Sequence, residues 1–284
     1  MRVGRLFLFS LCARLVYCDS VMRCVGVIPA RYFSQRLPRK VLLPIAGWPM
    51  IYWVYQNALN AGLDEVYVAT DHDEIRRAVE AFGGRAVLTS AEHASGTARV
   101  AELARTLDVP YFLNIQGDEP QMAPEVIRAV AAALCRGDAP VVSAMVRLCD
   151  AESYRSTAVV KVVTDRYGGA LYFSRAPIPC YRDSDGVACF KHLGIYGYTR
   201  DCLLGLPALP ASWLEDAERL EQLRFLESGV QIRMIEVAHD SVGVDTEEDL
   251  ERVRRVFEAN GAGAAAWRAT ALRQAGCREQ RQEV

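Results

Sequence analysis

One stretch near the start of the chain, residues 25–40, constrains the fold most. It begins with the apolar run Val25-Gly26-Val27-Ile28, which is typical of a strand buried on both faces of a parallel sheet. Pro29 cannot donate a hydrogen bond to a neighbouring strand, so we expect the strand to end there. The loop that follows carries four cationic side chains, those of Arg31, Arg36, Arg39 and Lys40, with Ser34 among them.

Such a loop has two interpretations. It can be an ordinary solvated basic loop. However, loops at the carboxyl ends of buried parallel strands are where open α/β sheets bind ligands. Arg can grip phosphate oxygens with paired hydrogen bonds, and Lys adds a mobile point charge. The position of the loop therefore favours the second interpretation, in which the loop binds a polyanionic ligand such as a triphosphate.

The residues after this loop alternate between strand and helix patterns with short connections. Helices are predicted from Pro49 to Gly62, over 73–82, around 100–107 and from Pro124, and strands over 66–69, 86–88, 111–115 and 140–147. Such alternation predicts an α/β fold, Rossmann-like, with a mostly parallel central sheet flanked by helices. Because no G-x-G-x-x-G motif follows the first strand, we reject a dinucleotide cofactor.

The second half of the chain reads differently. Strands over 159–163 and 170–173 are predicted to pair, and 190–198 to return as a strand with His192, Gly194 and Tyr196 on one face. We expect residues 155–200 to form a smaller β-rich part, whose apolar faces a second copy covers in a homodimer. A helix over 218–226, a strand over 231–236 and a long helix capped by Thr246 complete the pattern.

Composition excludes several classes of protein. The net charge of −2 argues against a nucleic-acid binder, and no apolar run is long enough to span a bilayer, so we expect no stable membrane insertion. The nine cysteines are odd in number and form no C-x-x-C pair, which favours a reducing, cytoplasmic compartment.

Both ends of the chain lie outside the expected single domain over 23–257. Residues 1–22 resemble a short signal peptide, but Arg14 interrupts their apolar run. We therefore expect an upstream mis-assigned start, with the working protein beginning near Met22. The tail 258–284 has no functional assignment.

An acidic turn follows one of the predicted strands. Asp118 lies in Gln116-Gly117-Asp118-Glu119-Pro120, directly after the strand 111–115; a further acidic residue, Asp245, precedes the last helix. Facing the cationic loop across one sheet edge, the carboxylates of the turn suggest a divalent ion, since Mg²⁺ prefers one or two carboxylates plus substrate phosphates. The alternatives are an acidic turn that caps the helix from Pro124, and a cap role for Asp245.

Taken together, the motifs are more specific than any one of them. They occur in this order: Ile28-Pro29-Ala30-Arg31, Arg36-Leu37-Pro38-x-Lys40, Ala69-Thr70-Asp71, Ser95-Gly96-Thr97, Gln116–Pro120, Ala170–Arg175, His192–Tyr196, Leu220–Arg224 and Gly243–Thr246. Over residues 23–257 the chain resembles the 3-deoxy-manno-octulosonate cytidylyltransferases, or CMP-Kdo synthetases. It departs from the family in carrying Arg39 where Gly is usual and Ala98 where Glu is usual.

This resemblance implies a nucleotidyltransferase fold, in which the smaller β-rich part serves sugar binding and dimerisation. It also implies an Mg²⁺-dependent reaction of 3-deoxy-manno-octulosonate (Kdo), CTP + Kdo → CMP-Kdo + diphosphate, in lipopolysaccharide biosynthesis. It implies catalytic roles for Arg31, Arg36, Lys40 and Asp118, and metal binding by Asp118 and Asp245. It implies nucleotide binding by Ala30, Arg31, Ser34, Arg36, Lys40, Asp71, Ser95, Gly96, Thr97 and Gln116. It implies sugar binding by Gln116, Arg175, His192, Tyr196, Glu221 and Gln222.

Each assignment has a plainer alternative from the residues alone. Arg175 could pair with a surface carboxylate, His192 and Tyr196 could be satisfied core polar groups, and Glu221 and Gln222 could lie on an exposed helix face. Two other functions also stay open. One is cytidylyl transfer to another sugar acid, such as sialic acid; the other is a nucleotide-binding regulatory module without turnover.

Overall fold

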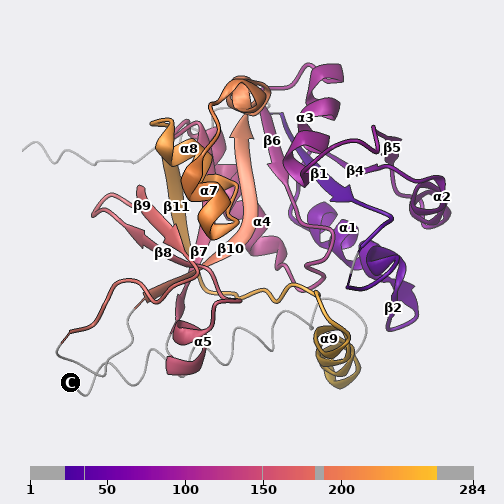
Figure 1. Cartoon of the computed structure of the whole chain (residues 1–284). Coiled ribbons are helices and arrows are strands. Elements are labelled where there is room, and N and C mark those ends of the chain that lie inside the picture. The colour runs from indigo at the N-terminus through magenta and orange to yellow at the C-terminus, as the bar shows by residue number, and fades with distance from the viewer. Residues whose placement is uncertain (1–22, 35, 149, 183–188, 261–284) are drawn as a thin grey trace, which may run out of the picture.

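A central mixed sheet organises the molecule (Figure 1). The computed structural model describes residues 23–34, 36–148, 150–182 and 189–260. Within these residues the sheet has nine strands, seven of them in the order β11-β7-β10-β6-β1-β4-β5. Their bounds are β1 (Cys24–Ala30), β4 (Glu65–Thr70), β5 (Ala86–Leu88), β6 (Tyr111–Asn114), β7 (Val141–Leu148), β10 (Cys189–Thr199) and β11 (Ile232–Val237).

Strand direction follows the predicted pattern. β1 pairs in parallel with β4 and β6, β4 with β5, and β7 with β11, whereas β10 runs antiparallel between β6 and β7. The predicted mostly parallel sheet is therefore confirmed. The hairpin β8 (Lys161–Thr164) and β9 (Ala170–Ser174) extends from β10, and β2 (Pro44–Ile45) and β3 (Trp48–Pro49) form a separate small pair.

The prediction that β1 ends at Pro29 is wrong, because the strand continues through Ala30 in register with Thr70 of β4. The carbonyl of Val27 accepts a hydrogen bond from the amide of Ile115, so the backbone of Val27 points toward β6. The backbone nitrogen of Pro29, two residues later, points the same way. Pairing with β6 ends at Val27, and the missing N–H of Pro29 leaves no strand partner unsatisfied. The proline is thus at a local edge, where a strand tolerates it.

Helices cover both faces of the sheet (Figure 1). One face packs against α1 (Met50–Asn60), α2 (Asp73–Ala81) and α4 (Pro124–Cys135), and the other against α3 (Gly96–Thr106), α6 (Arg200–Gly205) and α8 (Gln222–Glu227). Side chains of β1 alternate between these cores: Ile28 belongs to the first, and Val25 and Val27 to the second. Both faces of this strand are buried, as its sequence predicts.

The helix predicted over 218–226 begins later than expected and is preceded by a separate short helix. α7 (Trp213–Glu218) ends at Arg219, whose φ of 56° is left-handed, and α8 begins only at Gln222. Ser212 caps the amide of Glu215 at the start of α7. Because a left-handed residue cannot continue a right-handed helix, Glu221 lies at the start of α8 instead of inside a longer helix.

The remaining elements connect the layers. They are η1 (Lys40–Leu42), α5 (Ala151–Arg155), η2 (Leu206–Ala208) and α9 (Glu247–Asn260). The Thr246 cap of α9 is confirmed, since Thr246 Oγ1 accepts from the Asp249 amide and the Asp249 carboxylate accepts from the Thr246 amide. Leu250, Val253 and Phe257 of α9 pack on Trp53 of α1 in a third core. This packing brings Asp245, just before α9, to the sheet edge.

Among the described residues, no helix is both long enough and apolar enough to cross a bilayer. The expectations for the N-terminal extension and for the end of the C-terminal tail fall on residues outside the described ranges.

Candidate active site

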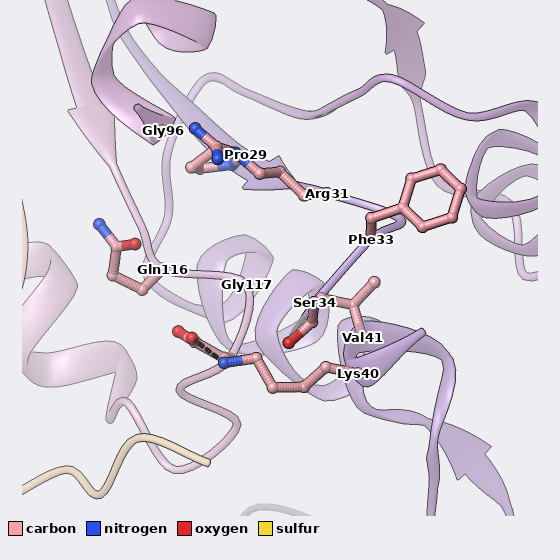
Figure 2. A pocket seen from close by; sticks show the side chains of 10 residues that line it. Pro29, Arg31, Phe33, Ser34, Lys40, Val41, Gly96, Gln116 and Gly117 are labelled. Carbon is pink, nitrogen blue, oxygen red and sulfur yellow. Dashed lines mark hydrogen bonds and ion pairs between the residues drawn. The ribbon is translucent and has the colours of Figure 1, made fainter. Parts of the chain in front are cut away.

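A lysine joins the two acidic segments. Lys40 Nζ donates to Asp118 Oδ2 at 2.6 Å and to Asp245 Oδ1 at 3.1 Å. The amide of Val244 also donates to the Asp118 carbonyl at 2.9 Å, so the backbones of these segments are tied as well. The structure therefore brings together the cationic loop and both of the aspartates expected at this edge (Figure 2 shows Lys40 reaching to the carboxylate).

The position of Asp118 depends on a glycine. A Cβ on Gly117 would lie 2.9 Å from the carbonyl oxygen of Pro29, closer than side-chain carbons approach. Only glycine therefore lets the segment after β6 run this close to the end of β1. This contact sets the loop that carries Asp118 against the strand that leads into the cationic loop.

The electrostatics of Lys40 fit a shared ion-pair centre. Its side chain is only 12% exposed, and burial by itself lowers the pKa of the ammonium. Asp118 and Asp245 more than reverse this effect, so the pKa of Lys40 lies above its ordinary value. Arg36 adds a second cation at 3.0 Å from Asp245 on the exposed side.

Three adjoining clefts form one groove along this edge. The cationic cleft, about 610 Å³, is lined by Arg31, Phe33, Ser34, Arg36, Lys40 and Asp245. The central cleft, about 210 Å³, shares several of these residues and adds Pro29, Val41, Gly96, Gln116, Gly117 and Asp118. The α7–α8 cleft, about 400 Å³, is lined by Ser95, Gly96, Thr97, Gln116, Tyr196, Tyr198, Glu215, Asp216, Arg219, Glu221 and Gln222.

The middle of the groove is held by hydrogen bonds between loops. Ser95 caps α3 by accepting from the Ala98 amide at 3.1 Å. Thr97 Oγ1 donates to Glu221 and accepts from Asn114 at 3.2 Å. The start of α3 is therefore connected both to β6 and to the start of α8.

Arg39, the departure from the usual glycine, adopts the left-handed conformation that glycine favours, with φ of 56°. For an L-residue this conformation costs about 1–2 kcal/mol. The side chain pairs with Glu74 at 3.3 Å and lies over the ring of Tyr32 at 5.4 Å. These contacts offset part of the cost and keep the loop geometry that precedes Lys40.

Four of the six expected sugar-binding residues line the α7–α8 cleft: Gln116, Tyr196, Glu221 and Gln222. Gln222 is 5% exposed, and its Nε2 has no hydrogen-bond partner among the described residues. A buried amide donor at the wall of a polar cleft suits a ligand acceptor. Burial, assisted by the carboxylates of Glu221 and Glu119, raises the pKa of Tyr196 well above its ordinary value, so its hydroxyl stays a donor.

The other two lie outside the lining of that cleft. His192 is buried, contacts Ser143 Oγ through Nε2 at 3.0 Å and packs edge-on against Phe173. Burial lowers the pKa of His192 to about 3, so the ring is neutral at physiological pH. Its ring centroid lies 5.3 Å from that of Tyr196, as their shared face predicts.

Arg175 lies against the end of α7. Its Nε donates to the Glu218 carbonyl at 2.9 Å and its Nη1 to the Thr157 carbonyl at 3.1 Å. The backbone amide of Arg175 and the hydroxyl of Ser174 both donate to the Glu218 carboxylate. Arg175 is thus joined to α7, whose residues Glu215 and Asp216 line the cleft.

Asp71 is likewise absent from the lining of the three clefts. Its Oδ1 accepts from the Tyr32 amide at 3.0 Å and its Oδ2 from Arg99 Nη2 at 3.0 Å. Both carboxylate oxygens are therefore used inside the protein.

Sequence reasoning missed several residues of the site. Tyr198, Glu215, Asp216 and Arg219 line the α7–α8 cleft, and Phe33 lines the other two. Tyr198 could have been found, because it continues the alternation of His192 and Tyr196 along one strand. The residues of α7 carry no motif, and only the break at Arg219 turns them toward the cleft.

Glu119, the neighbour of Asp118, is also more than a turn residue. Burial raises the pKa of its carboxyl to about 7, and the Oε1 atom would lie 2.6 Å from a Cβ at Gly194. A larger residue at Gly194 of β10 would therefore force the Glu119 side chain to move.

Comparison with known proteins now decides the family. The model of the family described as cytidylyltransferase matches residues 25–232. This chain belongs to the cytidylyltransferase family. It is 44% identical over 245 residues to the 3-deoxy-manno-octulosonate cytidylyltransferase of Geobacter metallireducens, covering 82% of this chain and 96% of the relative. The enzyme of that name from Escherichia coli is 44% identical over 236 residues, covering 83% and 96%.

A solved structure gives the same result. CMP:2-keto-3-deoxy-manno-octonic acid synthetase in complex with CTP aligns with a TM-score of 0.80 and 43% identity, over 84% of this cytidylyltransferase and 99% of that chain. A glucose-1-phosphate thymidylyltransferase from Bacillus anthracis, 15% identical with a TM-score of 0.62, shows the same fold over 86% of this chain and 98% of that chain. The fold class predicted from sequence is confirmed.

Removal of the Asp118 charge tests the ion-pair centre. We expect Asp118→Asn to lower turnover at least 100-fold, because Lys40 loses the charged partner with which it makes its shorter hydrogen bond, and the groove loses one negative charge. The melting temperature should stay within a few degrees, since the side chain is 32% exposed. Steady-state kinetics and thermal unfolding measure the two effects.

Asp138→Asn is the matched control. Asp138 is 33% exposed and pairs with Arg136 at 3.2 Å, outside the lining of the three clefts. It should keep wild-type turnover. A near-normal rate in Asp118→Asn would remove this residue from the mechanism.

Proposed function

We propose that this cytidylyltransferase activates Kdo by the reaction CTP + Kdo → CMP-Kdo + diphosphate. The observation that carries the proposal is the Lys40–Asp118–Asp245 centre at one end of a groove whose other end is lined by Tyr196, Glu221 and Gln222. Relatives at 43–46% identity bear the name of this activity, and the similar solved structure was determined with CTP.

The reaction requires two anions, CTP and the sugar acid, to approach each other closely. A hydroxyl of the sugar acid attacks the α-phosphorus of CTP, and diphosphate departs in line. Two unit charges about 4 Å apart interact by about 4 kcal/mol at an effective dielectric near 20, so cations must offset several such terms. Arg31, Arg36 and Lys40 supply them in the cationic cleft, with the Ser34 hydroxyl beside them. Arg31 is oriented by its hydrogen bond to the His93 carbonyl at 3.0 Å.

The donor set also fits Mg²⁺. Asp118 and Asp245 present carboxylate oxygens to one cation, the Lys40 ammonium, and Mg²⁺ takes few protein carboxylates when substrate phosphates complete its shell. Among the described residues, no cluster of three or more His, Cys, Asp or Glu side chains could hold a metal ion, so this site relies on the substrate phosphates for the remaining ligands. When bound, the ion supplies Lewis-acid stabilisation of the charge on the phosphoryl oxygens.

The middle of the groove is the proposed place of the cytidine. The Ser95-Gly96-Thr97 turn offers backbone groups at the start of α3, next to Gln116 and opposite Pro29 of β1. Ala30, expected at the nucleotide, is buried and outside the lining of the three clefts. A Cβ on Gly96 would lie 3.1 Å from the Pro29 ring, so a larger residue would narrow this part of the groove.

The α7–α8 cleft is the proposed sugar site. Glu221 and Gln222 supply an acceptor and a buried donor for hydroxyl groups, and Tyr196 adds a protonated phenol. We keep Arg175 for the sugar carboxylate because it lies against the end of α7, and His192 as a support for Tyr196. A reducing cytoplasm is part of the proposal, supported by the free thiols of Cys24, Cys135, Cys180, Cys189 and Cys202.

A substrate panel tests the proposal. We expect diphosphate release with CTP and Kdo in the presence of Mg²⁺, and at least tenfold slower release when UTP, ATP or GTP replaces CTP. Release only with a nine-carbon acid such as sialic acid would contradict the Kdo assignment. Binding of CTP without product from any sugar acid would support the regulatory-module alternative.

A homodimer is the proposed assembly. The β8–β9 hairpin exposes Tyr167 and Leu171, which are 73% and 62% exposed, and projects from the sheet (Figure 1). Exposed hydrophobic side chains on such a hairpin are suited to contact with a second copy. Light scattering should give twice the mass of one chain, and Leu171→Glu should reduce it to one. A wild-type monomer at micromolar concentration would contradict the dimer.

A further inference from the structure

The cationic loop is held by a charged pair that lies behind it. Asp71, just after β4, accepts from the Tyr32 amide through Oδ1 and from Arg99 through Oδ2, both at 3.0 Å. Tyr32 lies between Arg31 and Phe33, which line the clefts. One carboxylate thus connects the backbone of the cationic loop to helix α3.

Arg99 extends this connection to a second loop. Its Nη1 donates to Thr89 Oγ1 and, at 3.2 Å, to the carbonyl of Ser90. The guanidinium therefore spans Asp71 on one side and the start of the 89–95 loop on the other. Its side chain is 0% exposed, so it cannot reach a ligand in the groove.

A neighbour on the same face of α3 completes the link. Glu102, three residues after Arg99, accepts from the Ser90 amide at 3.0 Å and contacts the His93 ring. The carbonyl of His93 in turn accepts from Arg31 Nη2 at 3.0 Å. The cationic loop and the 89–95 loop are thus joined at Tyr32 and again at Arg31, with α3 as the common support.

We infer that Asp71 and Arg99 are positioning residues for the nucleotide, and that neither contacts it. The observation behind this is the chain of contacts from α3 through Arg99 and Asp71 to the Tyr32 amide. The inference rests on the proposed function for the identity of the nucleotide, CTP. The family resemblance implied that Asp71 binds the nucleotide directly. Asp71 instead holds the two loops that flank the proposed cytidine pocket.

The physical consequence is preorganisation. A loop that is ordered before CTP binds loses less conformational entropy on binding. Loss of this link, which we call the Asp71–Arg99 brace, should therefore weaken CTP binding. Tyr196, Glu221 and Gln222 of the sugar site lie on β10 and at the start of α8, outside the two loops that the brace holds.

Two variants distinguish the effect of the brace on CTP binding from a general loss of folding stability. Arg99→Lys keeps the positive charge beside Asp71, but an ammonium cannot span three acceptors in the manner of the planar guanidinium. Asp71→Ala with Arg99→Met removes both charges together, so no unpaired buried charge is left. Asp73→Ala with Arg76→Met, a partly exposed pair at 2.5 Å on helix α2, is the matched control.

Calorimetric titration with CTP and Mg²⁺ in the absence of sugar is the main readout. We expect the dissociation constant to rise at least tenfold in Arg99→Lys and in the Asp71/Arg99 double variant, and to stay within twofold in the control. The KM for Kdo should change less than threefold in all of them. Amide hydrogen exchange at Tyr32 should be at least tenfold faster in the double variant.

Unchanged CTP affinity in folded Arg99→Lys would overturn the inference, whatever the exchange rates show. If the double variant does not fold, Arg99→Lys decides alone. If the wild-type chain itself does not bind CTP, the proposed function fails, and the brace is then judged by exchange at Tyr32: unchanged exchange overturns it, and faster exchange supports it.

Discussion

The site depends on one ammonium group between two carboxylates. Lys40 connects segments that lie 78 and 205 residues away in the sequence, and it does so with a side chain that is largely withdrawn from water. Taking a charge out of water is unfavourable unless opposite charges and hydrogen bonds compensate it. Asp118 and Asp245 provide that compensation, which is why the pKa of Lys40 is raised despite burial. In the proposed function, the same two carboxylates hold the metal cation when the phosphates of the nucleotide enter.

The sheet places these groups by simple geometry. β1 and β6 are parallel neighbours, so the cationic loop and the Asp118 turn leave the same edge. Gly117 lets the turn approach the Pro29 carbonyl, and the Val244 amide binds the Asp118 carbonyl. The packing of α9 against α1 then brings Asp245 to this edge. The third core therefore contributes directly to the site, although it lies outside the sheet.

Much of this arrangement could be predicted from local patterns. The strands and the Thr246 cap depend on periodicity and capping, which act within a few residues, and the mostly parallel direction follows from the alternation of strands and helices along the chain. The end of β1 was mispredicted because the tolerance for Pro29 depends on where β6 stops, which is not a local property. The break at Arg219 was missed because no glycine marks its left-handed turn.

The roles of individual polar residues were harder to predict for the same reason. Asp71 and Arg99 are separated by 28 residues, and only the fold reveals that they share a buried contact. His192 and Arg175 lie within family motifs. In the structure, however, the His192 ring contacts Ser143, and the Arg175 guanidinium donates to backbone carbonyls. A motif thus indicates which residues matter, and the contacts show whether they face a ligand or support a neighbour.

The central claim is that Lys40, Asp118 and Asp245 form a single metal–nucleotide centre. Its most direct test is a crystal structure with CTP and Mn²⁺, in which anomalous scattering locates the ion. The account predicts one anomalous peak coordinated by both aspartates and by triphosphate oxygens, with Lys40 turned to the phosphates. A peak elsewhere in the protein, with Lys40 still paired to Asp118 and Asp245 while CTP is bound, would contradict it.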